Sequence, residues 1–233
     1  MKKYVLLLIT IISSLYASSP NPIFAENGMV VSTSKHASEA GVSILKKGGN
    51  AIDAAAAVGF ALAVTRPENG NLGGGGFIIS TTSDGKIFTQ DHREKAPGRS
   101  HRDMFLDNNG SVIPGMSLVS RASSGVPGTV HGLLSAWSDH GSGNIGLQQL
   151  LLPAIRLAEK GFLLSHYQAE FFNSYKENLL INKAAAKIFI RKDKRQWKQG
   201  DRIIQKDLAK TLKRIAKYGT AGFYKGVTAD LIV

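Results

Sequence analysis

The stretch Gly48-Gly49-Asn50-Ala51-Ile52-Asp53-Ala54-Ala55-Ala56-Ala57, followed by apolar residues up to Val64, says most about the fold. Asn50 is a typical helix N-cap, and Asp53 stands three residues later, where its charge suits the helix dipole. We therefore interpret Asp53 as a capping group rather than a catalytic acid. The helix predicted over 51–64 is apolar on all sides, so it must be buried on several of them. Its many alanines allow close packing against a sheet.

On the N-terminal side of this helix, the segment Gly28–Ser32 is expected to form a short strand. Apolar residues then recur with helical spacing over about 34–47. Gly48 and Gly49 are expected to end that helix, because a glycine just past a helix adopts the left-handed conformation easily.

On the C-terminal side lies a glycine run, Gly70-Asn71-Leu72-Gly73-Gly74-Gly75-Gly76. A P-loop is excluded because Phe77, and not Lys-Ser/Thr, follows the last glycine. The glycine spacing does not open a helix after a strand, as a dinucleotide site requires. We interpret the run as a buried turn in which a Cβ atom would clash. Two strands, 77–82 and 86–91, are predicted next, joined by the hairpin signal Asp84-Gly85.

The second of these strands runs into the charged segment Asp91-His92-Arg93-Glu94-Lys95-Ala96-Pro97. Polar groups at the end of a core strand often line a functional site, because a rigid element aims their side chains. The planar fork of Arg93 matches a carboxylate in two hydrogen bonds. The residues alone leave an alternative open, a structural ion pair between Arg93 and Asp91 or Glu94.

The rest of the chain is predicted to be mainly helical after a loop-rich segment over 98–130. The predicted elements are helices at 129–140, 147–160 (started or kinked by Pro153), 166–180 and 205–218, a strand-like Ile188-Phe189-Ile190, and a last helix capped by Thr228. The sequence stops at Leu231-Ile232-Val233 without a stop signal, so we expect a truncated chain.

Composition and charge exclude several classes of protein. The chain has 233 residues and no cysteine, which rules out a disulfide scaffold, a Cys-ligated zinc or iron–sulfur site and a Cys nucleophile. No histidine spacing suggests a metal site, and we expect no metal and no cofactor.

The net charge of the chain is +12, with 12 basic and 10 acidic residues over 1–150 but 17 basic and 7 acidic residues over 151–233. A basic half can attract nucleic acid or anionic lipid, although a solvated surface is the simpler interpretation. Nucleic acid is not expected, because aromatic residues do not alternate with the basic run Arg191–Arg195.

The N-terminus has the pattern of an export signal. Lys2 and Lys3 precede an apolar run from Tyr4 to Tyr16, and Ala17-Ser18-Ser19-Pro20 follows. Residues 1–25 are therefore predicted to be a signal peptide, cleaved after Ala17 or Ala25, with the mature chain periplasmic or secreted. The run is shorter than the roughly 20 residues that span a bilayer, so no stable membrane insertion is expected.

Together, these segments resemble the γ-glutamyltransferase family (γ-glutamyltranspeptidase, glutathione hydrolase) in its exported bacterial form. The resemblance covers about 28–233 and rests on motifs in the family order. They are Gly28–Ser32, Gly48–Ala55, Gly70–Phe77, Arg93-Glu94-Lys95-Ala96-Pro97, Arg102-Asp103-Met104-Phe105-Leu106, Gly125-Val126-Pro127-Gly128-Thr129 and Phe223-Tyr224-Lys225-Gly226.

This resemblance implies an α+β fold, the four-layered αββα sandwich of N-terminal-nucleophile hydrolases, present here only in part. Family members are precursors that cleave themselves, and a threonine at the start of the small subunit transfers the γ-glutamyl group of glutathione or a related amide to water or an amino acid. Residues 26–233 would be a truncated large subunit, without a catalytic residue, inactive alone and lacking its small-subunit partner. By resemblance, Arg93 is the substrate-binding residue that holds the α-carboxylate of the γ-glutamyl group. His92 stands where relatives often carry an apolar residue.

Two other interpretations remain open at this point. The chain could be a non-enzymatic binding module, in which Arg93 and the basic surface hold anions. It could also be an inert gene remnant. A downstream reading frame that begins like a small subunit would favour the enzyme, and salt-sensitive binding to anionic polymers would favour the module.

Overall fold

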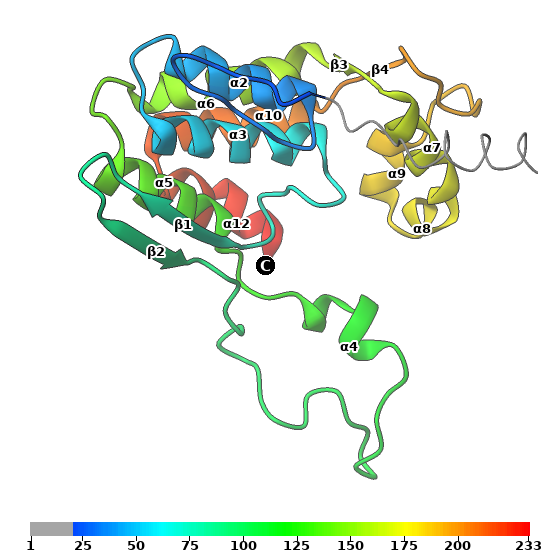
Figure 1. Cartoon of the computed structure of the whole chain (residues 1–233). Coiled ribbons are helices and arrows are strands. Elements are labelled where there is room, and N and C mark those ends of the chain that lie inside the picture. The colour runs from blue at the N-terminus through cyan, green and yellow to red at the C-terminus, as the bar shows by residue number, and fades with distance from the viewer. Residues whose placement is uncertain (1–20) are drawn as a thin grey trace, which may run out of the picture.

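A computed structural model describes residues 21–233 (Figure 1). The predicted export signal from Lys2 to Ala17 lies outside the described residues. Ala25, the second candidate cleavage position, lies exposed in an irregular segment.

The first two helices are those that the sequence predicts, α2 (Lys35–Leu45) and α3 (Ala51–Thr65). The Asn50 side chain accepts hydrogen bonds from the N–H groups of Ile52 and Asp53, and the Asp53 carboxylate accepts one from the Asn50 N–H at 2.8 Å. A second N–H, that of Ser142, donates to the same carboxylate at 3.0 Å. The interpretation of buried Asp53 as a capping group is confirmed.

Four helices form a layer, in which α2 packs on α3, α3 on α6 (Leu147–Lys160), and α6 on α10 (Lys206–Tyr218). Helix α5 (Thr129–His140) packs against another side of α3 (Figure 1). The core between them contains the fully buried side chains of Phe60, Leu150 and Leu212. Pro153 lies inside α6 rather than at its start.

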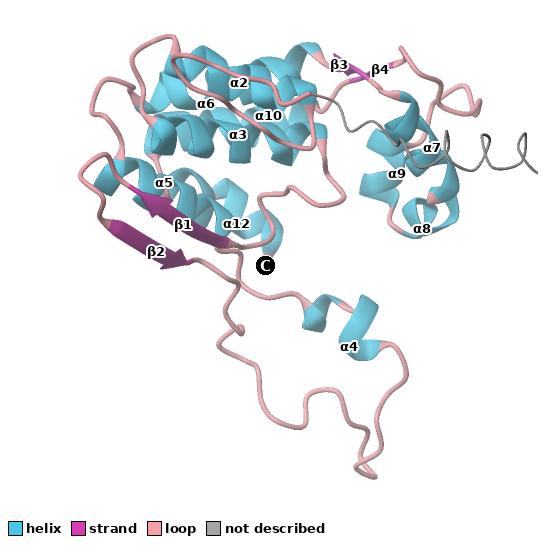
Figure 2. Ribbon diagram, in the orientation of Figure 1, coloured by secondary structure: helices cyan, strands magenta, loops and turns pink. Residues whose placement is uncertain are grey.

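A two-stranded antiparallel hairpin lies beside α5. It consists of β1 (Phe77–Thr81) and β2 (Ile87–Asp91), with Ile79 opposite Thr89. Burial alternates along both strands, so the side chains of Phe77, Ile79 and Ile87 are exposed. In Figure 2 no further strand of the described chain lies against this hairpin.

Two parts extend from the helical layer. An arm over 96–125 carries α4 (Met116–Val119) and a 3₁₀ turn, Arg121–Ser123; its ends meet where Lys95 and Val126 form an antiparallel bridge. A lobe contains α7 (His166–Ser174), α8 (Lys176–Ile181) and α9 (Lys183–Phe189), and a small sheet of β3 (Phe162–Leu163) and β4 (Arg202–Ile203) joins it to the layer. The chain continues through α11 (Ala221–Tyr224) and α12 (Val227–Ile232).

Four local predictions were wrong. Gly28–Ser32 is irregular, because no described strand pairs with it. The single helix predicted over 166–180 is split at Tyr175 into α7 and α8. Ile188 and Phe189 are helical because the Asn182 cap and three alanines outweigh their preference for strands. Thr228 lies inside α12, where its hydroxyl donates to the Gly222 carbonyl at 2.9 Å and accepts from Arg214 Nε at 2.8 Å.

Candidate functional site

The end of β2, the glycine run and the start of α5 come together at one place. The N–H groups of Gly128 and Thr129, at the start of α5, both donate to the Gly74 carbonyl, at 2.8 and 2.9 Å. The His92 N–H donates to the Gly76 carbonyl at 2.9 Å. A Cβ atom on Gly75 would meet the backbone of 92–94. The clash predicted for this turn is confirmed, although the turn is only half-buried.

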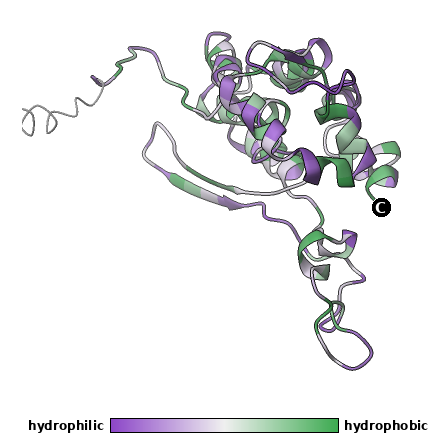
Figure 3. Ribbon diagram, turned by 90° about the vertical axis from the view of Figure 1, so that its right-hand side faces the viewer, coloured by the Kyte–Doolittle hydropathy of each residue, from purple (hydrophilic) through white to green (hydrophobic). Residues whose placement is uncertain are grey.

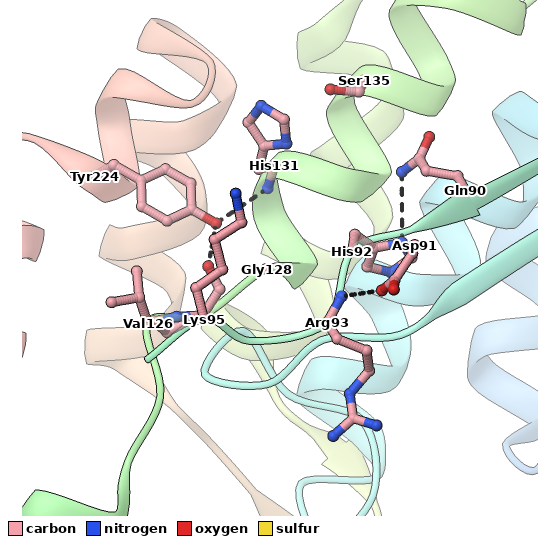
Figure 4. Close-up of a pocket in the computed structure, with 11 residues that line it drawn as sticks. Gln90, Asp91, His92, Arg93, Lys95, Val126, Gly128, His131, Ser135 and Tyr224 are labelled. Atoms are coloured by element: carbon pink, nitrogen blue, oxygen red, sulfur yellow. Dashed lines mark hydrogen bonds between the residues drawn. The ribbon is translucent and has the colours of Figure 1, made fainter. Parts of the chain in front are cut away.

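This junction forms one wall of an open cavity of about 450 Å³ (Figure 4). The cavity lies between the end of β2, the loop before α5, α5 itself and α11. Its lining residues are Gln90, Asp91, His92, Arg93, Lys95, Val126, Pro127, Gly128, His131, Ser135 and Tyr224.

Arg93 lies at the rim of this cavity. Its backbone N–H donates to Asp91 Oδ1 at 2.9 Å, and its Nε donates to Glu94 Oε2 at 2.8 Å. This pairing raises the pKa of Arg93 and lowers the pKa of Glu94. The Arg93 side chain is 58% exposed and points away from His131 and Tyr224 (Figure 4). An ion pair with Glu94 is thus present, but the terminal guanidinium nitrogens hydrogen-bond to none of the residues in the described part of the chain.

His92 forms the inner wall of the cavity. Cβ atoms added at Gly76 or Gly132 would run into its ring. Gln90 Nε2 lies 3.4 Å from His92 Nδ1 and donates to the Gly132 carbonyl at 2.8 Å. Burial lowers the pKa of His92, and Asp91 and Glu94 offset this in part. The imidazole is therefore mostly neutral at pH 7.

Tyr224, His131 and Ser135 form the opposite side, and sequence reasoning did not identify them as site residues. The Tyr224 hydroxyl donates to the Pro127 carbonyl at 2.7 Å and accepts from the His131 N–H at 3.2 Å. Burial raises the pKa of Tyr224. Two signals were available: His131 and Ser135 are four residues apart on one helix face, and Tyr224 belongs to a motif already singled out.

The lining of the cavity holds two cations, Arg93 and Lys95, and one carboxylate, Asp91, which accepts a backbone N–H. The exposed guanidinium of Arg93 is a group that can bind an anion. Within residues 21–233 no hydrogen bond joins Ser135 to a histidine, so no activated serine is assembled there. The same part of the chain contains no group of three or more His, Asp or Glu residues placed to hold a metal ion. None of its helices is both long and apolar enough to cross a bilayer.

Comparison with known proteins gives the family. The sequence profile described as Gamma-glutamyltranspeptidase matches residues 37–233. The chain belongs to the γ-glutamyltranspeptidase family. Among curated γ-glutamyltranspeptidase relatives, the glutathione hydrolase proenzyme of Pseudomonas sp. (strain A14) is 45% identical over 221 residues, which are 94% of this chain and 38% of the relative. That of Escherichia coli (strain K12) is 43% identical over 212 residues, 91% of this chain and 36% of the relative.

A solved γ-glutamyltranspeptidase shows the same fold. The crystal structure from Helicobacter pylori is 44% identical with a TM-score of 0.86, over 91% of this chain and 60% of that one. The α+β fold predicted from the resemblance, a partial N-terminal-nucleophile hydrolase sandwich, is thereby confirmed. The described residues supply one helical layer and a two-stranded piece of sheet. The chain spans well under half of the length of these two curated relatives.

Proposed function

We propose that this chain is the N-terminal, large-subunit part of an exported γ-glutamyltransferase. The whole enzyme would transfer the γ-glutamyl group of glutathione, or of a related amide, to water or to an amino acid. The match of residues 37–233 to the γ-glutamyltranspeptidase family carries this proposal. The large-subunit assignment agrees with the share of the relatives that the chain spans.

In this proposal Arg93 binds the α-carboxylate of the γ-glutamyl group. Three observations support the role: Arg93 follows directly after a strand, lines a cavity and exposes its guanidinium. Glu94 accepts a hydrogen bond only from Nε of Arg93. The two terminal nitrogens can therefore donate two parallel hydrogen bonds to a carboxylate. Glu94 would orient the guanidinium, so the ion pair and the substrate-binding role are compatible.

The catalytic threonine is proposed to belong to a small subunit that pairs with this chain. No residue of the described cavity provides a nucleophile with a hydrogen-bonded base, and so the chain alone should not hydrolyse γ-glutamyl amides. The exposed apolar side chains of the hairpin are consistent with a missing partner sheet. Export through residues 1–25 is likewise part of the proposal.

A chimaera tests the enzymatic function. Residues 26–233 would replace the aligned segment of the E. coli relative, whose remaining length would supply the rest of the large subunit and the small subunit. We expect self-cleavage into two subunits and hydrolysis of a chromogenic γ-glutamyl anilide, whereas the chain alone, purified from a host that lacks its own enzyme, should show no turnover. A chimaera that folds and cleaves itself but does not turn over the anilide would contradict the proposal. Export is tested separately, by fusing residues 1–30 to a reporter that functions only in the periplasm.

A further inference from the structure

The lobe of α7–α9 and the following turn concentrates positive charge. This lobe, residues 166–198, contains eight Lys or Arg and three acidic side chains, which gives it +5 of the chain's net charge of +12. Seven of the eight basic residues are exposed: Lys176, Lys183, Lys187, Lys192, Lys194, Arg195 and Lys198. The density of positive charge on this short segment is far above that of the first 150 residues.

Asp193 of the lobe accepts hydrogen bonds from the side chains of Arg191 and Arg195 at 2.8 and 2.9 Å, and Asp201, just beyond the lobe, pairs with Arg191. Glu170 and Glu177 are exposed and form no ion pair with a described residue. Within residues 21–233, no carboxylate lies within 4 Å of the ammonium groups of Lys176, Lys183, Lys192, Lys194 and Lys198. The arginines thus hold the turn together, and the lysines remain available to an outside anion.

The turn itself has a backbone that costs energy. Lys194 has a φ of +60°, a left-handed conformation that residues with a side chain rarely adopt. Trp197 holds the turn against α7 and α9. Its ring nitrogen donates to the Phe189 carbonyl at 2.7 Å, and its backbone N–H donates to Asn173 Oδ1 at 2.8 Å. Lys194 and Arg195 of the turn and Lys176 of α8 line the same hollow of about 60 Å³.

Apolar side chains are exposed beside these cations. Ile181 is 83% exposed at the end of α8, and Leu180 and Tyr175 are about half-exposed. Leu180 lies four residues after Lys176 and so shares its face of the helix. Exposed apolar residues next to lysines are typical of segments that lie in the headgroup region of a bilayer, whereas binding to a soluble polyanion needs only charge.

The position of the lobe suits such a contact. Figure 1 shows α7, α8 and α9 at the opposite end of the molecule from the β1–β2 hairpin. Both the cavity of Arg93 and the exposed face of the hairpin therefore stay accessible when the lobe is occupied.

We infer that the lobe, defined as residues 166–198, is a docking surface for an anionic phospholipid membrane. The lysines would approach the lipid phosphates, and Leu180 and Ile181 would enter the headgroup region. This inference does not rest on the proposed enzymatic function, since it uses neither the cavity nor the missing subunit.

Vesicle flotation with the full chain tests the inference, because floating vesicles leave aggregates behind. The lobe variant carries Lys176→Gln, Lys183→Gln and Lys192→Gln. The control variant carries Lys46→Gln, Lys47→Gln and Lys225→Gln, which removes the same charge from exposed positions outside the lobe. A third variant carries Leu180→Ser and Ile181→Ser. All share the N-terminal segment of the parent chain, so differences among them report on the substituted residues. Vesicles of phosphatidylglycerol and phosphatidylcholine are compared with phosphatidylcholine alone.

We expect salt-sensitive binding to the anionic vesicles that falls about 100-fold in the lobe variant and no more than about threefold in the control. The apolar variant should lose several-fold in vesicle binding but keep its affinity for heparin, a soluble polyanion. Equal losses in the lobe and control variants would overturn the inference. So would an apolar variant that binds vesicles like the parent chain, because the surface would then serve a soluble polyanion. Circular dichroism of each variant checks that the fold is retained.

Discussion

The guanidinium of Arg93 has two uses, and they involve different nitrogens. Nε pairs with Glu94, while the terminal nitrogens are directed to solvent at the rim of the cavity. The sequence indicated the position, a charged residue at a strand end, but not this division, because a side-chain rotamer depends on its neighbours in space. Tyr224 and His131 were not identified as site residues for the same reason. They are 93 residues apart in the sequence and come into contact only where α11 lies against α5.

In the chimaera, Arg93→Ala should lower kcat/KM for a γ-glutamyl amide by roughly 30- to 4,000-fold, because the substrate carboxylate would lose its partner in a charge pair that substrate binding buries. Arg93→Lys should recover only part of this, because an ammonium keeps the charge and loses the fork. The melting temperature should change little, since the side chain is exposed. A variant that melts earlier while its folded fraction keeps kcat/KM within threefold of the parent would refute the binding role.

His92 makes stability depend on pH. Burial lowers its pKa below that of the unfolded chain, so the unfolded state takes up a proton first as the pH falls. The contribution of neutral His92 to the free energy of unfolding is therefore complete above about pH 6.5, the usual pKa of an unfolded histidine, and it decreases below that pH. We expect His92→Phe to flatten the decline in melting temperature between pH 7 and pH 5. His101→Phe, at an exposed position in the arm, serves as control and should leave the slope unchanged. If the melting temperature of both variants falls with pH as steeply as that of the parent chain, His92 is not the group responsible.

At the scale of elements, the contact between β2 and α5 depends on the absence of side chains. A Cβ atom at Gly128 would overlap the carbonyl oxygen of His92, and the glycine run supplies the carbonyl that holds the first turn of α5. The hairpin and the helices α2, α3, α5, α6 and α10 were predictable because their patterns are local. Helix α9 was not predictable, because the Asn182 cap outweighs the strand preference of its last residues. The irregular structure of 28–32 was not predictable either, because it depends on the lack of a described strand beside it.

Gly128→Ala should therefore push α5 away from the end of β2 and open the cavity. Because the obstacle is backbone rather than a mobile side chain, we expect a loss of stability of about 1–3 kcal/mol, measured by urea unfolding. Gly98→Ala is the matched control, since nothing lies within 4 Å of its added Cβ atom. If both variants unfold at the same urea concentration, the close approach is not what this glycine provides.

At the scale of the molecule, the described residues leave an apolar sheet face open. Figure 3 shows hydrophobic stretches on the hairpin, whose other face contacts α5 through Phe88 and Gln90, and on the exposed arm. Phe77, Ile79 and Ile87 are each at least two-thirds exposed. A two-stranded sheet is barely stable without a covering layer. The fold class followed from the resemblance, whereas the extent of the uncovered surface could be seen only once the strands were placed.

The isolated chain should therefore self-associate or remain loosely packed. Size-exclusion chromatography with light scattering should show oligomers, and binding of a hydrophobic dye should fall when a small subunit is co-produced. A monodisperse monomer that unfolds in one sharp transition would contradict this expectation.

The bridge between Lys95 and Val126 has a practical consequence for the arm. Since the two hydrogen bonds of this bridge, 2.7 and 3.2 Å long, join the ends of the arm, the thirty residues between them form a closed loop on the surface. Exposed loops with joined ends are the places where chains accept cuts and insertions. A protease or an inserted epitope at Asn109-Gly110 would thus meet backbone that the helical layer does not need, and the two halves of a nicked chain would stay together through the packing of α3 on α5 and α6.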